Sequence, residues 1–157
     1  MPPTLLYDLS KVDFRKIVVS QEGIRAIIPQ RFEMEMLTGI VHEDDTEDVI
    51  IGVKDVRADE FWVRGHIPGR PLFPGVLMIE TAAQLCAYWT MKRRPQMGFI
   101  GFAKCDEVRF RAPVIPPAKL FIVVKTIELN NRRAVGKCQG ILNGNMVFEA
   151  TITGMSV

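Results

Sequence analysis

The sequence predicts an α+β domain in which a largely antiparallel sheet curls around one long, buried helix. Residues 76–91, VLMIETAAQLCAYWTM, are apolar on nearly every side, and such a helix must be covered on nearly every side. The segments that flank it are short, rich in β-branched residues and separated by turn residues, which is typical of antiparallel strands. One curled sheet covers several sides of the helix, and a second copy of the chain would cover the rest. We therefore expect a dimer.

Before the helix, residues 1–32 predict an irregular or partly helical lead-in that Pro29 interrupts. Strands are predicted at 36–42 and 49–56, with the polar turn HEDDTED at 42–48 between them. A structured loop is predicted at 59–74, because the run IPGRPLFPG at 67–75 is rich in proline and glycine. Pro74 suits the first position of a helix, where the missing N–H of proline removes no hydrogen bond.

After the helix, the basic run Lys92-Arg93-Arg94 suits the negative helix end, and Pro95 prevents continuation. Further strands are predicted at 98–114, 119–129, 134–142 and 145–154. Asn143-Gly144 is a strong hairpin signal. The predicted order is two strands, the helix, and about four strands in a meander. With 157 residues and no repeat or linker, the chain predicts a single domain.

Composition excludes several function classes. A net charge of +2 and the lack of an aromatic-plus-basic ladder argue against nucleic-acid binding. Three cysteines without C-x-x-C spacing and two histidines argue against a zinc site. Free thiols favour a reducing compartment. No signal-peptide pattern opens the sequence, and no apolar run reaches the roughly 20 residues of a membrane span. We expect a cytoplasmic protein.

Glu80 lies inside the apolar helix, where an unpaired carboxylate is unfavourable. Its pKa is expected to rise, which would make it a proton donor near neutral pH. An ion pair with Arg64 or Arg70 is the equally weighted alternative.

His66 lies in the proline- and glycine-rich loop ahead of the helix, and imidazole is the natural base at neutral pH.

The backbone amides at the helix start offer a third component. The N–H groups of Gly75 and Val76 have no partner within a helix and can bind a developing oxyanion. Gln84 lies one turn after Glu80 and can either orient its carboxyl or fill polar space. A base, an acid and an oxyanion site together indicate proton abstraction beside a carbonyl, with loss of a leaving group.

The segment Gly65–Gln84, G-H-I-P-G-R-P-L-F-P-G-V-L-M-I-E-T-A-A-Q, closely resembles the motif of the 3-hydroxyacyl-(acyl-carrier-protein) dehydratases of type II fatty acid synthesis. That motif runs His-Phe-Pro-Gly-x-Pro, then Pro-Gly-Val-Leu, a carboxylate fourteen residues after the His and a Gln four residues later. His66, Glu80 and Gln84 keep these spacings. Weaker similarity extends from about Ile27 to Ile152.

The resemblance implies an enzyme that dehydrates (3R)-3-hydroxyacyl thioesters on acyl carrier protein to trans-2-enoyl thioesters. It implies that His66 removes the C2 proton and that Glu80 of the partner subunit protonates the departing hydroxyl. It further implies that the Gly75 N–H, beside Val76, binds the thioester carbonyl and that Gln84 orients Glu80. No cofactor and no metal are implied.

The resemblance also implies the hot-dog fold, with one dehydratase domain over residues 1–157 and its central helix at about 75–91. The lead-in at 1–22 has no counterpart in the family. Family members are homodimers, often trimers of dimers, with two sites at each dimer interface. The glutamate at position 80 resembles the dehydratase-only branch. The sequence departs from the family pattern at Gln30, Ile67 and Pro117-Ala118.

Local charge suggests a partner surface. Residues 33–60 hold ten acidic side chains, and residues 92–137 hold eleven Lys and Arg but three acids. The basic stretch is either a solvated face or a docking patch for the acidic carrier protein. The candidate patch residues are Lys92, Arg93, Arg94, Lys104, Arg109 and Arg111.

Three apolar residues are candidates for the lining of an acyl tunnel or are ordinary core residues: Phe73, Leu77 and Phe99.

Two other functions remain open from the sequence. A thioesterase of the same fold also carries an acid on its central helix, but no His-Pro-Gly loop precedes that helix. A non-catalytic protein that binds acyl thioesters would not need His66 and Glu80. A serine hydrolase is excluded because the sequence has no G-x-S-x-G motif.

Overall fold

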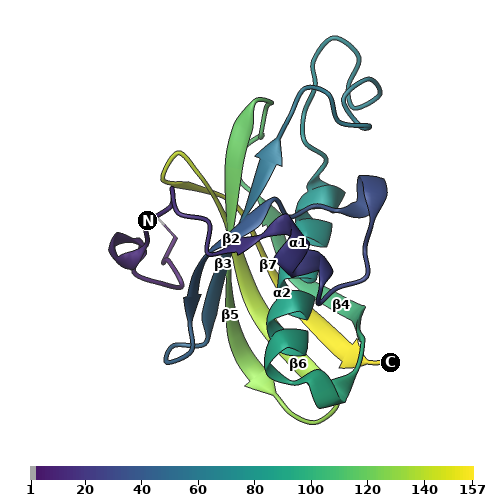
Figure 1. Cartoon of the computed structure of the whole chain (residues 1–157). Helices are drawn as coiled ribbons and strands as arrows, with labels where there is room; N and C mark the ends of the chain where they lie inside the picture. The colour runs from purple at the N-terminus through teal and green to yellow at the C-terminus, as the bar shows by residue number, and fades with distance from the viewer. Residues whose placement is uncertain (1–2) are drawn as a thin grey trace.

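Seven antiparallel strands wrap a single 19-residue helix in the computed structural model, which describes residues 3–157 (Figure 1). The helix is α2 (Gly75–Arg93). The strands are β1 (Val19–Ser20), β2 (Gly39–Asp44), β3 (Val49–Val56), β4 (Ile100–Phe110), β5 (Ala118–Leu129), β6 (Arg133–Leu142) and β7 (Asn145–Ser156). The predicted α+β architecture, with one helix against a curled sheet, is therefore present.

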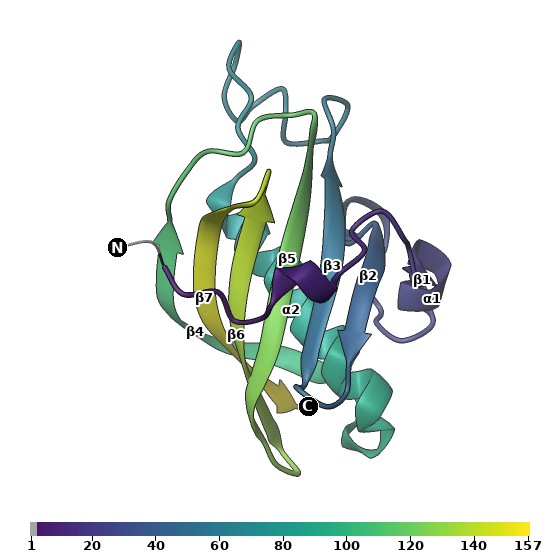
Figure 2. The same cartoon turned by 90° about the vertical axis from the view of Figure 1, so that its left-hand side faces the viewer.

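The strand order is β1-β2-β3-β5-β6-β7-β4, so the predicted four-strand meander is wrong for its first strand. β5, β6 and β7 do form a meander, but β4 pairs with β7 at the far edge. Both neighbours of β5 are already taken, by β3 and β6. Residues 111–117, with three prolines, carry the chain from the edge strand to the middle of the sheet (Figure 2).

Element boundaries differ from the predicted ones by a few residues. β2 begins at Gly39 rather than at 36, because the Met36 N–H is bonded to a side chain of α2 and not to a neighbouring strand. The turn after it shortens to residues 45–48. α2 continues to Arg93, since Lys92 and Arg93 form ion pairs with acids at the β2–β3 turn. β4 is shorter than predicted, at 100–110.

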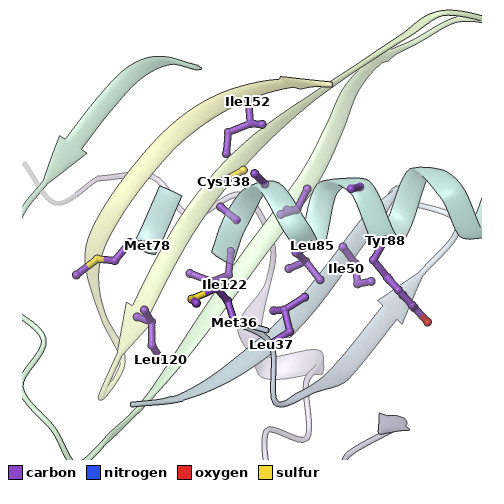
Figure 3. Close-up of a cluster of buried hydrophobic side chains, with 14 of the residues drawn as sticks. Met36, Leu37, Ile50, Met78, Leu85, Tyr88, Leu120, Ile122, Cys138 and Ile152 are labelled. Atoms are coloured by element: carbon purple, nitrogen blue, oxygen red, sulfur yellow. The ribbon is translucent and has the colours of Figure 1, made fainter. Parts of the chain in front are cut away.

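The main core lies between α2 and the concave face of the sheet. Leu85 and Tyr88 of the helix are buried with Ile50, Ile122 and their neighbours (Figure 3). Burial of each such large apolar side chain contributes about 1.5–3 kcal/mol to stability. At Gly52 a Cβ would lie 3.0–3.1 Å from the side chains of Leu37 and Leu85, so this glycine lets the helix approach β3 closely.

The lead-in crosses the outer, convex face of the sheet, and we call residues 4–18 the N-terminal strap (Figure 2). It contains the 3-10 helix η1 (Leu9–Lys11) and leads through β1 to α1 (Gln21–Arg25). Tyr7 is buried there with strand residues such as Val41 and Ile51. Its hydroxyl donates to Asp44 at 2.6 Å and lies 2.8 Å from His42 Nε2. Burial and the bond to Asp44 raise the pKa of Tyr7 to about 12.

Within residues 3–157, no helix combines the length and apolar character that crossing a membrane requires.

Candidate active site

A buried ion pair anchors the loop that carries the candidate base. Lys54 of β3 and Glu60 form this pair, and their side chains are 3% and 7% exposed. The other carboxylate oxygen of Glu60 accepts a hydrogen bond from the Arg57 N–H at 2.8 Å. The Lys54 ammonium also lies 5.8 Å from the centre of the Phe73 ring. The two ends of the loop at 57–74 are therefore tied to the same strand.

His66 is held by two contacts with one residue of the same loop. The Leu72 N–H donates to the His66 carbonyl at 2.9 Å, and His66 Nδ1 lies 2.8 Å from the Leu72 carbonyl oxygen. A carbonyl oxygen only accepts, so Nδ1 carries the proton and the lone pair of the neutral ring is on Nε2. Because His66 is exposed, this nitrogen is available as a base.

His66 and the start of α2 line one open cavity of about 600 Å³. Phe73 brings the loop to the segment that follows β4, because its N–H donates to the Val114 carbonyl at 2.8 Å. The lining residues are His66, Leu72, Phe73, Gly75, Val76, Met78, Phe110, Arg111, Ala112 and Pro113. The structure therefore brings the candidate base and the candidate oxyanion site together.

The candidate tunnel residues do not share this cavity. Phe73 lines it, but Leu77 packs against the core, and Phe99 lies after the other end of α2 and is 41% exposed. Sequence reasoning missed Met78 and Phe110. Met78 could have been predicted from the helical repeat, because a residue three positions after Gly75 lies on nearly the same side of the helix. Phe110 belongs to the segment VRFRAPV at 108–114. The position of this segment beside the start of α2 depends on tertiary structure.

The first amides of α2 are free to bind an anion. Pro74 is the N-cap residue and provides no side-chain hydrogen bond; its carbonyl accepts from Leu77 and Met78. Within residues 3–157, the N–H groups of Gly75 and Val76 have no acceptor. These two donors add to the positive end of the helix dipole. A Cβ at Gly75 would lie 2.8 Å from the Phe110 ring, so only glycine fits without displacement.

Glu80 and Gln84 form a second polar group, on another face of α2. The Gln84 carboxamide is buried, and its Nε2 donates to Glu80 Oε1 at 2.8 Å and to the Met34 carbonyl at 2.6 Å. Its Oε1 accepts from the Met36 N–H at 3.2 Å. Gln84 therefore fixes the Glu80 carboxyl to the segment at 34–36.

The alternative for Glu80, an ion pair with Arg64 or Arg70, is not found among the residues that the structure describes. Glu80 is half-buried. Gln30, at one of the positions where the sequence departs from the family pattern, lies near Gln84 in a small cavity. Its Oε1 is buried without a protein partner in the described part of the chain.

One chain does not bring His66 and Glu80 together. Glu80 follows Gly75 by five residues, which is about 140° around a helix of 3.6 residues per turn. Glu80 is accordingly absent from the lining of the His66 cavity and faces the segment at 34–36 instead. The candidate base and the candidate acid of one chain therefore face different directions.

The candidate basic patch divides into two groups. One group lies at the C-terminal end of α2 and consists of Lys92, Arg93 and the C-cap residue Arg94. The other lies at the C-terminal end of β4 and consists of Arg109 and Arg111, of which Arg111 lines the His66 cavity. A helix of this length separates its two ends by about 27 Å. Lys104 lies between these groups on β4 and pairs with Asp106.

Two of the three helix-end residues are already engaged by acids of the same chain. Lys92 pairs with Glu43 at 2.8 Å, and Arg93 pairs with Asp48 and stacks on the Trp89 ring. Burial alone would raise the pKa of Asp48, but the hydrogen bonds from Arg93 and Trp89 outweigh it and lower that pKa. Arg111 pairs with Glu149, while Arg109 is exposed and has no ion pair within the described residues.

A metal site was not expected, and across residues 3–157 no group of three or more His, Cys, Asp or Glu side chains is arranged to hold a metal ion.

Comparison with known proteins assigns the chain to a family. Residues 28–151 match the family model of the FabA-like domain. The chain belongs to this family. The FabA-like region contains both candidate catalytic residues and most of the sheet, and it begins after the N-terminal strap.

Curated relatives of this FabA-like protein are named 3-hydroxyacyl-(acyl-carrier-protein) dehydratase FabZ. The one from Rhizobium rhizogenes is 36% identical over 143 residues, which is 85% of each chain. The one from Bacillus pumilus is 32% identical over 137 residues, 87% of this chain and 94% of the relative. The predicted family and the predicted enzyme class, hydro-lyase, are confirmed.

Solved structures similar to the FabA-like chain confirm the predicted hot-dog fold. The dehydratase heterocomplex ApeI:P from Xenorhabdus doucetiae matches with a TM-score of 0.73 at 14% identity, covering 85% of this chain and 90% of the other. A mutant thioesterase from Pseudomonas aeruginosa matches with a TM-score of 0.61 at 14% identity, covering 74% and 78%. At these identities the likeness concerns the fold alone.

Proposed function

We propose that this protein dehydrates (3R)-3-hydroxyacyl thioesters carried on acyl carrier protein to trans-2-enoyl thioesters in fatty acid synthesis. The observation that carries the proposal is a shared cavity: the free Nε2 of His66 and the unpaired amides of Gly75 and Val76 line the same space. A base and an oxyanion site at one place suit proton abstraction beside a thioester carbonyl.

The chemistry proceeds in two linked parts. His66 Nε2 removes a proton from C2 of the substrate, and the negative charge that develops on the thioester oxygen is stabilised by the Gly75 and Val76 amides. One such donor contributes about 10²–10³-fold to a rate. The hydroxyl on C3 leaves as water after it receives a proton from Glu80, whose carboxyl is held by Gln84.

A second copy of the chain supplies the acid in this proposal, because His66 and Glu80 of one chain face different directions. The free edge of β4 is the natural place for the second copy. β4 has 11 residues and carries the exposed side chains of Phe102 and Phe110. Among residues 3–157, it pairs only with β7. Such a long free edge invites pairing with another strand. A homodimer with two sites follows, and the trimer of dimers stays a prediction.

The wild-type reaction tests the function directly. Purified protein is incubated with 3-hydroxyacyl thioesters of several chain lengths, and the enoyl absorbance and the free thiol are followed together. Enoyl product without thiol release is the expected result. Thiol release without enoyl product would make the protein a thioesterase, and binding of acyl thioester without either product would make it a binding protein.

Carrier docking is proposed at the end of β4 that borders the His66 cavity. Arg109→Glu is expected to raise the KM for carrier-bound substrate several-fold and to leave kinetics on a small thioester mimic unchanged, since a rim charge acts through encounter with the acidic partner. Arg94→Glu, at the far end of α2, is the matched control and should leave both substrates unaffected. Equal loss on the carrier-bound and the small substrate would contradict docking at this position.

The compartment is proposed from the thiols. All three cysteines are free, and two of them, Cys86 and Cys138, are near one another. Cysteines persist as thiols in reducing compartments. We therefore assign the protein to the cytoplasm, where type II fatty acid synthesis would supply its substrates.

A further inference from the structure

Two cysteines meet between α2 and the sheet, away from the His66 cavity. Cys86 lies in the second half of α2, Cys138 lies on β6, and their sulfur atoms are 3.7 Å apart. Figure 3 shows Cys138 on the sheet beside the helix. The two residues are 52 positions apart in the sequence, so only the fold brings them together. Neither side chain has a part in the proposed dehydration.

The surroundings leave room for a small oxidant. Cys86 is half-buried and lines a narrow cavity between the second half of α2 and strands β4 to β7. The cavity has a volume of about 20 Å³. This is enough for a molecule of about the size of water, so only a very small oxidant can approach Cys86 through this cavity. At Gly136, a Cβ would lie 3.1 Å from the Cys86 sulfur, so the glycine keeps this sulfur free to move.

We propose that Cys86 and Cys138 form a redox modification site, in which hydrogen peroxide oxidises Cys86 and Cys138 then closes an intramolecular disulfide. The sulfur atoms would have to approach from 3.7 Å to about 2.05 Å. The disulfide would tie α2 to β6.

The two cysteines have different roles in this reaction. Cys138 is 1% exposed, and both its hydrogen bond with Cys86 and its burial raise the pKa of its thiol well above the ordinary value. It therefore remains a thiol and is shielded from solvent. Cys86 is the accessible partner and reacts first. A peroxide-reactive cysteine next to a resolving cysteine is the usual arrangement of redox-responsive pairs.

The atoms balance in two steps. The Cys86 thiolate attacks one oxygen of hydrogen peroxide, the O–O bond breaks, and a sulfenic acid and hydroxide form. The Cys138 sulfur then attacks the Cys86 sulfur, the S–O bond breaks, and the oxygen leaves as water with the Cys138 proton. Peroxide is the oxidant, and the two thiols are oxidised to one disulfide.

Peptide mapping of the full-length, wild-type protein tests the site. The reduced protein is treated with increasing hydrogen peroxide, quenched with an alkylating reagent, and digested without reduction. We expect a peptide in which Cys86 is linked to Cys138, with Cys105 alkylated, and loss of this link after dithiothreitol. The closed loop should also raise the midpoint of thermal unfolding relative to the reduced protein.

Variants assign the partners. Cys86→Ser should abolish the linked peptide, and the matched control Cys105→Ser should retain it. Because serine at the buried position 138 can unfold the protein, the wild-type map decides the identity of the second cysteine. A disulfide that contains Cys105, a link between subunits, or overoxidation of Cys86 with Cys138 still alkylated would overturn the proposal.

Discussion

Replacement of His66 by alanine is expected to lower kcat by about 10²–10⁴-fold, which is the usual contribution of a positioned general base. The effect follows from the loss of Nε2, which carries the lone pair of the neutral ring when Nδ1 donates to the Leu72 carbonyl. The fold should survive, because the side chain is exposed and the lost hydrogen bond contributes only about 1 kcal/mol. Enoyl formation and thermal unfolding are measured on the same preparation.

The other histidine of the chain provides the matched control. His42 lies on the outer face of the sheet, where its ring contacts the Tyr7 hydroxyl. His42→Ala should therefore weaken the hold on the N-terminal strap and leave kcat close to the wild-type value. Comparable losses of kcat in both variants would mean that the His66 effect is structural, and would remove His66 from the proposed chemistry.

Glu80→Gln is expected to lower kcat to a similar degree, since an amide cannot supply the proton to the leaving hydroxyl. Glutamine keeps the shape of the side chain and an oxygen that can accept from Gln84, so the local geometry should persist. A stable, correctly folded protein with little turnover is the expected outcome. Near-normal turnover would show that another group donates the proton.

Mixed dimers of the two variants test whether the acid comes from the partner subunit. Subunits of His66→Ala and Glu80→Gln are allowed to exchange, and each mixed dimer would then contain one complete site. Activity should recover to roughly a quarter of the wild-type value, because about half of the dimers are mixed and half of their sites are complete. A mixture that stays inactive would place both groups in one subunit. The double variant mixed with either single variant should restore nothing and is the control.

The sequence was most informative where the chemistry depends on local spacing. The apolar run and Pro74 predicted α2. The loop around His66 and the spacing of Glu80 and Gln84 predicted candidate site residues whose contacts are made with residues close to them in the sequence. The helix starts at Gly75 and the four-residue step produces the hydrogen bond between Gln84 and Glu80. Such features depend on the helical repeat and the loop backbone, which neighbouring residues determine.

Long-range pairing could not be predicted in the same way. The alternation of β4 indicates a strand but does not indicate which strand pairs with it, so its place beside β7 was missed. For the same reason the sequence did not indicate that Phe110 would lie over Gly75, or that Arg93 would be bound by Asp48. Apolar candidates such as Phe99 were chosen by residue type alone, and type does not determine which cavity a side chain lines.

The N-terminal strap has a consequence for the order in which the chain assembles. The Leu6 N–H and the Thr4 carbonyl both bond the carboxamide of Gln139, across 133 and 135 residues. A contact between residues so far apart in the sequence has a large entropic cost of loop closure. We therefore expect it to form after the structure between the two residues has formed. The strap is accordingly expected to dock late in folding and to detach early in local unfolding. Its detachment would uncover the apolar convex face around Val41 and Ile51 while the dehydratase core is still folded. We therefore expect residues 4–18 to protect the folded chain from aggregation.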